Sequence, residues 1–166
     1  MNISLIGFMG TGKTSVAKIL AKRLAYDLID LDEEIVKRDG RSIPEIFAQD
    51  GEGYFRNLES QVTADFSKKD RQVISTGGGV VLRSENIDNL KKKGIVVLLE
   101  ASAKEILKRT SNDNNRPLLN VEDPLAKIKS MLEHRRNKYD CTPYKIDTNK
   151  LEVEEVVEEI IKIVKN

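Results

Sequence analysis

The segment with the most recognisable chemistry is residues 7–14, GFMGTGKT, which fits the pattern G-x-x-x-x-G-K-[ST] completely. An apolar run precedes it and an amphipathic run follows, as in the strand–loop–helix setting of a phosphate-binding loop. Its glycines let backbone N–H groups close around a phosphate, and the helix N-terminus adds partial positive charge. The segment therefore predicts a nucleoside triphosphate site.

The side chains of this loop have different expected roles. Lys13 supplies a mobile positive charge for the β- and γ-phosphates, and Thr14 supplies a hydroxyl for Mg²⁺. The alternative is a glycine-rich turn of purely structural use, which the complete register of strand, glycines, lysine and threonine disfavours. The predicted nucleotide-binding residues of the loop are Gly10, Thr11, Gly12, Lys13, Thr14 and Ser15.

Two further matches would favour a GTPase. Residues 50–53 read D-x-x-G and residues 137–140 read N-K-x-D. In a GTPase these motifs follow parallel strands, where ligands of such sheets bind. Here the preceding segments, IPEIFAQ and KSMLEHRR, have helical patterns. We therefore interpret both matches as chance.

Asp30 and Asp32 end the second predicted strand, at the sheet edge where the phosphates would lie. Alternation along a strand puts both carboxylates on one side of the chain. One carboxylate can lie near Mg²⁺ and the other near an acceptor hydroxyl. The alternative is that Asp30 or Asp32 caps the following helix. Beside a phosphate-binding loop, the functional interpretation is favoured.

Three consecutive glycines, residues 77–79, end the third predicted strand. They weaken both strand and helix, so something approaches the backbone closely or the turn is very tight. The functional interpretation is that N–H groups donate to a bound carboxylate or hydroxyl, and the alternative is a plain turn.

Several arginines are candidates for binding an anion. Arg56 lies beside the apolar stripe of its helix and could equally form a surface ion pair with Glu59. Arg116 lies in the long polar segment 111–123, where it is either a lid arginine that closes over ATP or a solvated loop residue. Arg135 and Arg136 lie in a charged helix and would pass for solvated surface.

The elements that must position these residues alternate along the chain. The predicted strands are residues 3–6, 28–30, 72–75, 95–99 and 144–146, and the predicted helices are 15–24, 54–66, 124–139 and 153–164. Ser42 and Ser102 each have a glutamate three residues on, the spacing of a capping box. This alternation predicts a single α/β domain, residues 1–166, with a parallel sheet between two layers of helices.

Composition excludes several classes of partner. Among 166 residues, 28 are basic and 27 acidic, so the net charge of +1 gives no basic footprint for nucleic acid or an anionic membrane. No run approaches the roughly 20 apolar residues of a membrane span. Cys141 is the only cysteine, so no intrachain disulfide can form. We expect a cytoplasmic monomer that acts on small molecules.

Together these stretches resemble the shikimate kinase family over nearly the whole chain. They are GFMGTGKTS, LIDLDEEI, GEGYFRNLE, STGGGVV, NRPLL and IDTN. The resemblance implies transfer of the ATP γ-phosphate to the 3-hydroxyl of shikimate, with Mg²⁺, in the chorismate pathway of aromatic amino acid biosynthesis. It also implies a five-stranded parallel sheet of the nucleoside-monophosphate-kinase type, with a lid at about 111–123 and a substrate-binding helical region at about 32–60.

The resemblance also implies roles for individual residues. Asp32 assists deprotonation of the acceptor hydroxyl, and Asp30 is the outer-shell Mg²⁺ partner. Glu59 orients Arg56. The other implied residues are Arg56, Gly78, Gly79 and Arg135 at the acceptor carboxylate, Arg109 against adenine, and Arg116 as the catalytic lid arginine.

The chain departs from the family pattern at one place. The family usually reads E-R-x-P-L-Y around its second substrate arginine, whereas this chain has HRRNKY at residues 134–139, without the proline. Counting back four residues from Tyr139 selects Arg135, and Arg136 is its neighbour. Both stay open from the sequence.

Three other functions compete with this one. Gluconate kinase also has a polyhydroxy carboxylate as acceptor, and the arginines and triple glycine favour shikimate over it. A catalytically silent nucleotide-binding module would be marked by loss of the lysine, the second aspartate or the lid arginine, and Lys13, Asp32 and Arg116 are all present. A GTPase switch is the third.

Overall fold

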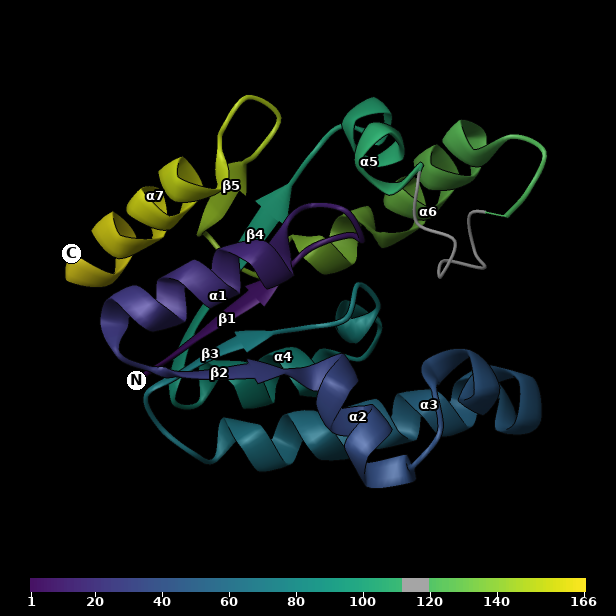
Figure 1. Ribbon diagram of the computed structural model, residues 1–166, viewed down its shortest axis with the longest axis horizontal. Helices are drawn as coiled ribbons and strands as arrows, with labels where there is room; N and C mark the ends of the chain where they lie inside the picture. The colour runs from purple at the N-terminus through teal and green to yellow at the C-terminus, as the bar shows by residue number, and fades with distance from the viewer. Residues whose placement is uncertain (112–119) are drawn as a thin grey trace.

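A computed structural model, which describes residues 1–111 and 120–166, contains one five-stranded parallel sheet (Figure 1). The strand order is β2-β3-β1-β4-β5, and all four pairings are parallel. The strands are β1 (Asn2–Ile6), β2 (Asp27–Asp30), β3 (Gln72–Ser75), β4 (Gly94–Glu100) and β5 (Lys145–Asp147). Each lies within two residues of its predicted position, so the predicted sheet is confirmed.

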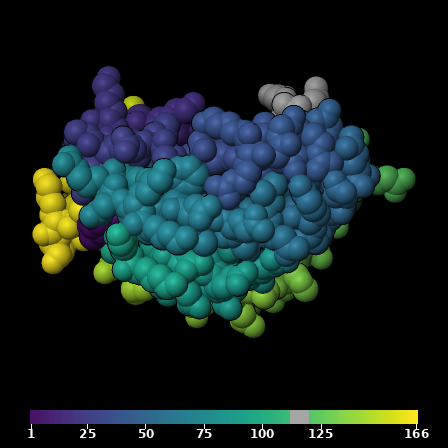
Figure 2. Space-filling view, turned by 90° about the horizontal axis from the view of Figure 1, so that it is seen from below, coloured from purple at the N-terminus to yellow at the C-terminus, as the bar shows by residue number. Residues whose placement is uncertain are grey.

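Helices cover both faces of this sheet. On one face lie α1 (Lys13–Leu24) and α7 (Val153–Lys165), seen together on one side of the strands in Figure 1. The other face packs against α2 (Leu31–Asp39), α3 (Ile43–Ser67), α4 (Ser84–Lys91), α5 (Ala103–Thr110) and α6 (Pro124–Tyr139). A short 3₁₀ turn, η1 (Val80–Leu82), joins the triple glycine to α4. Figure 2 shows α2, α3 and α4, in blue and teal, as one continuous outer face.

The alternation of side chains along the central strands produces the two cores. In β4, Val96 and Leu98 belong to the core under α2–α6, whereas Val97 and Leu99 belong to the core under α1 and α7. Because these strands are buried on both faces, they read as continuous apolar runs. The parallel direction brings the carboxyl ends of all five strands to one edge of the sheet, where the predicted site residues follow them.

Of the two predicted capping boxes, one is complete: Ser42 and Glu45 form a reciprocal box at α3. The Asp123 carboxylate also caps α6, accepting from the Ala126 N–H. At α5 only half of the box forms. Ser102 Oγ accepts from the Glu105 N–H, but the Glu105 carboxylate pairs with an arginine one turn on instead.

The two GTPase-like matches lie in helices, as their context predicts. Asp50 is in α3, just before a kink at Gly51 (φ 80°), and Asn137 is in the last turn of α6. Neither follows a strand.

The sequence did not predict α4 as a helix. In the described ranges, no helix combines the length and apolar character needed to cross a membrane.

Candidate active site

A cleft of about 690 Å³ lies at the carboxyl edge of the sheet. The segments that line it are far apart in the sequence. They are residues 9–16 of the phosphate-binding loop and the start of α1, Asp32, residues 76–78, part of α5, and residues 148–153, which lead from β5 into α7. The sheet therefore assembles the phosphate-binding loop, one of the predicted carboxylates and two of the three glycines around one space.

The phosphate-binding loop leads directly into α1. Gly12 is the N-cap residue with φ 94°, a left-handed conformation that favours glycine. Neither a capping side chain nor an acidic residue occupies the first turn, so the α1 N-terminus presents uncompensated positive charge to the cleft. Thr14 and Ser15 lie exposed on this first turn and line the cleft. This arrangement suits a polyphosphate.

The Lys13 ammonium is buried within the loop. Its Nζ donates to the Gly7 carbonyl at 2.7 Å and to the Phe8 carbonyl at 2.9 Å, and the residue is 8% exposed. Thr11 is also buried, and its Oγ1 donates to the Phe8 carbonyl at 2.8 Å. These bonds hold the positive charge of Lys13 at the side of the cleft that the loop forms.

The two predicted carboxylates have different surroundings. Asp30 Oδ1 accepts from the N–H groups of Asp32 and Glu33, at 3.0 and 3.3 Å, so Asp30 caps α2. Of the two interpretations of Asp30, the structure therefore shows the helix cap. Asp32 lies on the first turn of α2 and lines the cleft, and a Cβ added to Gly77 would lie 2.9 Å from its Oδ1.

The residues present fit Mg²⁺ carried with a nucleotide. In residues 1–111 and 120–166 no group of three or more His, Cys, Asp or Glu side chains could hold a metal ion. Mg²⁺ usually keeps several waters and takes one or two protein ligands plus substrate phosphates, so it needs no such cage. The exposed Thr14 hydroxyl beside the loop, with the Asp32 carboxylate lining the same cleft, is a donor set of this kind.

Arg56 and Glu59 form an ion pair on one face of α3. Arg56 Nη1 donates to Glu59 Oε1 at 2.9 Å, and the side chains are 12% and 2% exposed. Burial raises the pKa of the Glu59 carboxyl, and Arg56 acts against this shift. Glu59 Oε2 is buried and has no hydrogen-bond partner in the described part of the chain. The pair is therefore not the exposed surface pair that the sequence left open.

Gly79 lies directly against the Arg56 guanidinium. A Cβ at residue 79 would lie 2.4 Å from both Nη1 and Nη2, so a larger residue would displace the arginine. Gly77 lies similarly close to Asp32 and Glu59 Oε2. The triple glycine is thus a place where side chains approach the backbone closely, and donation from its N–H groups to a ligand stays a prediction.

The structure separates the two neighbouring arginines of α6. Arg135 is 7% exposed, its Nη1 donates to the Gly78 carbonyl at 3.2 Å, and its guanidinium lies 5.6 Å from the centre of the Phe8 ring. No carboxylate lies within ion-pair distance of Arg135 in residues 1–111 and 120–166. Arg136 points outward, with a 76% exposed side chain 3.5 Å from Glu133. Of the two, only Arg135 reaches the triple glycine.

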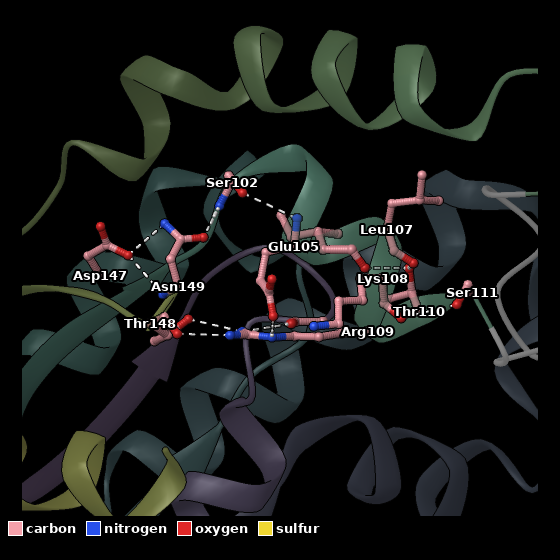
Figure 3. Close-up of polar contacts among 12 residues, drawn as sticks. Ser102, Glu105, Leu107, Lys108, Arg109, Thr110, Ser111, Asp147, Thr148 and Asn149 are labelled. Carbon is pink, nitrogen blue, oxygen red and sulfur yellow. Dashed lines mark hydrogen bonds and ion pairs between the residues drawn. The ribbon is translucent and has the colours of Figure 1, made fainter. Parts of the chain in front are cut away.

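Arg109 lines the cleft and is held there by four hydrogen bonds (Figure 3). Its Nη2 donates to the Thr148 carbonyl at 2.8 Å, its Nη1 to Thr148 Oγ1 at 3.0 Å and to the Gly10 carbonyl at 3.3 Å. Its Nε donates to Glu105 Oε1 at 3.1 Å. These bonds orient the guanidinium plane, as a planar partner for a base would require.

Sequence reasoning from side-chain chemistry missed two parts of this site. Residues 148–153 line the cleft, and their signal was their place directly after the last parallel strand. Tyr139 is buried, and its hydroxyl donates to the Gly78 carbonyl at 2.9 Å, which no spacing rule indicated. The predicted lid arginine, Arg116, and most of the segment 111–123 lie outside the described residues.

A parallel sheet of this order, with a phosphate-binding loop after β1 and further binding groups after β2, β3 and β5, defines a P-loop kinase of the nucleoside-monophosphate-kinase type. The family model described as "Shikimate kinase" matches residues 9–165. The chain belongs to the shikimate kinase family.

Relatives agree over nearly the full length. A shikimate kinase of Thermodesulfovibrio yellowstonii is 51% identical, covering 97% of this chain and 93% of the relative. One of Caldanaerobacter subterraneus is 46% identical, covering 97% and 94%. Among solved structures, the shikimate kinase of Acinetobacter baumannii in complex with shikimate superposes with a TM-score of 0.94 at 38% identity, covering 99% and 92%. The expected fold and the expected class of ATP-dependent kinase are confirmed.

Proposed function

We propose that this enzyme transfers the γ-phosphoryl group of ATP to the 3-hydroxyl of shikimate, giving shikimate 3-phosphate and ADP. The observation that carries the proposal is Arg135, a buried guanidinium with no carboxylate within ion-pair distance in the described ranges. A buried charge without a counter-ion costs free energy unless a ligand compensates it. The shikimate complex of the Acinetobacter baumannii relative supports shikimate as that ligand.

The acceptor carboxylate is held by two arginines in this proposal. Arg56 and Arg135 approach the triple glycine from α3 and α6, and Gly78 and Gly79 lie between them. Guanidinium groups match a planar carboxylate with forked hydrogen bonds. Glu59 keeps Arg56 in place through the 2.9 Å bond.

The transfer itself needs a base and a stabilised phosphoryl group. Asp32, at the border of the nucleotide cleft and the triple glycine, accepts the proton of the attacking hydroxyl. The oxygen of that substrate hydroxyl then attacks the γ-phosphorus as the bond between the γ-phosphorus and ADP breaks. Lys13 and the α1 N-terminus stabilise charge on the phosphoryl oxygens, and positioning and charge supply most of the catalysis in such reactions. We propose that Arg116 also stabilises charge on the phosphoryl oxygens.

We propose that Mg²⁺ accompanies ATP, with Thr14 as protein ligand and Asp30 in the outer shell. When bound, the ion neutralises charge on the β- and γ-phosphates. Asp30 can serve the outer shell while its Oδ1 caps α2, because a carboxylate has several lone pairs. Arg109 is proposed to stack on adenine. A cytoplasmic location and a monomeric state stay predictions.

A coupled assay for ADP tests the function, with shikimate and gluconate as acceptors and ATP and GTP as donors. We expect turnover with ATP and shikimate, and little with gluconate or GTP. Turnover with gluconate alone would replace the proposal by its nearest rival. Hydrolysis of GTP without an acceptor would favour a switch.

The Lys13→Ala variant supplies the companion test. Because the Lys13 side chain lines the cleft and is not part of the hydrophobic core, we expect turnover to be lost while the fold is kept. Circular dichroism and urea unfolding check the fold. Near-normal turnover in the folded variant would contradict the role of the phosphate-binding loop.

A further inference from the structure

Two donors from one helix converge on a single carbonyl of the triple glycine. Arg135 and Tyr139 are one turn apart on α6, so both side chains project from the same face. Arg135 Nη1 donates to the Gly78 carbonyl at 3.2 Å, and the Tyr139 hydroxyl donates to the same oxygen at 2.9 Å. A carbonyl oxygen has two lone pairs, so these two bonds occupy both of its acceptor positions.

These bonds fix the plane of the peptide between Gly78 and Gly79. No peptide bond in the described chain is cis, and a trans peptide is planar, so the Gly79 N–H points opposite to the Gly78 carbonyl. Glycine otherwise allows many backbone conformations, and three in a row would leave this plane poorly determined. Gly79 also lies against the Arg56 guanidinium. The orientation of the plane therefore sets both an N–H donor and the position of an acceptor arginine.

We propose that Tyr139 is a positioning residue for the acceptor: its hydroxyl holds the Gly78 carbonyl so that the Gly79 N–H and Arg56 are presented to the carboxylate of the substrate. Arg135 alone would not suffice, because it must also reach the substrate. Tyr139 contacts no substrate atom in this proposal and acts only through Gly78. The inference rests on the proposed function.

The surroundings of Tyr139 suit a permanently un-ionised donor. Tyr139 is 7% exposed and belongs to the core under α2–α6. Burial raises the pKa of the Tyr139 hydroxyl, and the nearby Arg135 acts in the opposite direction. The positive charge of Arg56 also lowers the pKa of this hydroxyl. The ring fills space in the core, so the phenylalanine variant retains the packing and loses only the donor.

The test is steady-state kinetics of Tyr139→Phe with each substrate varied in turn. We expect the shikimate KM to rise about tenfold, the scale of one buried hydrogen bond, with the ATP KM unchanged. The matched control is Ser67→Ala, which removes another buried hydroxyl-to-carbonyl bond, from Ser67 Oγ to the Thr63 carbonyl at 2.7 Å, at the far end of α3. Both variants should lose comparable stability, but only Tyr139→Phe should change the shikimate KM.

A double-mutant cycle tests the shared carbonyl directly. If Arg135 and Tyr139 both act through Gly78, the effects of Tyr139→Phe and Arg135→Ala on the shikimate KM should be less than additive. An unchanged shikimate KM in Tyr139→Phe, or full additivity, would overturn the inference while leaving the function in place. Absence of wild-type turnover with shikimate would instead overturn the proposed function.

Discussion

Two clusters of charged residues on α2, α3 and α6 use arginine in opposite ways. In the Arg41 cluster, at the α2–α3 junction, Arg41 binds the carboxylates of Asp39 and Asp50 and lies over the Tyr54 ring, and Tyr54 also donates to Asp39. In the acceptor cluster, formed by Arg56, Glu59, Gly78, Arg135 and Tyr139, Arg135 has a carbonyl and a ring but no carboxylate within ion-pair distance in the described chain.

The difference lies in how each charge is balanced. Arg41 is 26% exposed and has two counter-ions, so it is satisfied by the protein and by water. The acceptor cluster buries its charges and leaves Glu59 Oε2 without a partner in the described residues. Burial without full pairing lowers stability, and such sites are expected where a ligand completes them. The first cluster is thus interpreted as structural and the second as functional.

The strongest test of this contrast is Arg135→Ala. Removing one partner of a buried charge pair costs about 3–5 kcal/mol, which corresponds to a rise in the shikimate KM of about 150- to 4,000-fold. The ATP KM should change little. The control is Arg136→Ala, whose exposed side chain should contribute almost nothing. A large effect at Arg136 with none at Arg135 would contradict the assignment.

Glu59→Gln sharpens the contrast through pH. Because burial raises the pKa of Glu59 in the folded state, the unfolded chain loses this proton first as pH rises, so Glu59 lowers stability progressively above its unfolded pKa. The variant lacks this effect. We expect its free energy of unfolding, relative to wild type, to rise with pH above about 4.3 in urea titrations.

The same variant should bind the acceptor less well. Glutamine keeps a hydrogen bond to Arg56 but loses the charge, so the shikimate KM should rise about fivefold. An unchanged KM together with an unchanged pH dependence would remove Glu59 from the acceptor cluster.

Arg41→Ala probes the other side of the comparison. It removes both ion pairs and the contact with Tyr54, so the urea midpoint should fall. The shikimate and ATP KM values should stay within about twofold, because Arg41 is not among the described residues that line the cleft. Arg38→Ala is the control, because Arg38 is a neighbouring exposed arginine with one carboxylate partner, Asp65, at 2.9 Å. A large rise in the shikimate KM would show that the Arg41 cluster serves the site.

The smallest effect is expected from Asp39→Asn, and this loss of stability should be present at neutral pH and disappear in acid. Hydrogen bonds from Arg41 and then Tyr54 lower the pKa of Asp39 to about 2. The stabilisation is therefore present above the unfolded pKa near 3.9 and is lost as pH falls toward 2. The difference in urea midpoint between wild type and variant should shrink between about pH 4 and pH 3. A difference that grows in acid would contradict this assignment.

Local sequence patterns determined much of this protein. The strand–loop–helix around residues 7–14 and the five apolar runs predicted the phosphate-binding loop and the parallel sheet, because both depend on short-range geometry and periodicity. Resemblance to the family supplied Arg56, Glu59 and Arg135 as acceptor residues, and the structure brings all three to the triple glycine. Their individual roles stay predictions.

Only the tertiary structure decided which of two residues of the same type, close together in the sequence, belongs to the site. Asp30 and Asp32 share a strand end, yet Asp30 caps α2 while Asp32 lines the cleft. Arg135 and Arg136 are neighbours in a charged helix, yet successive helical residues point about 100° apart, so only Arg135 is buried against Gly78. Tyr139 and residues 148–153 joined the site through packing between distant segments. Such contacts depend on the meeting of elements far apart in the chain, which no local pattern records.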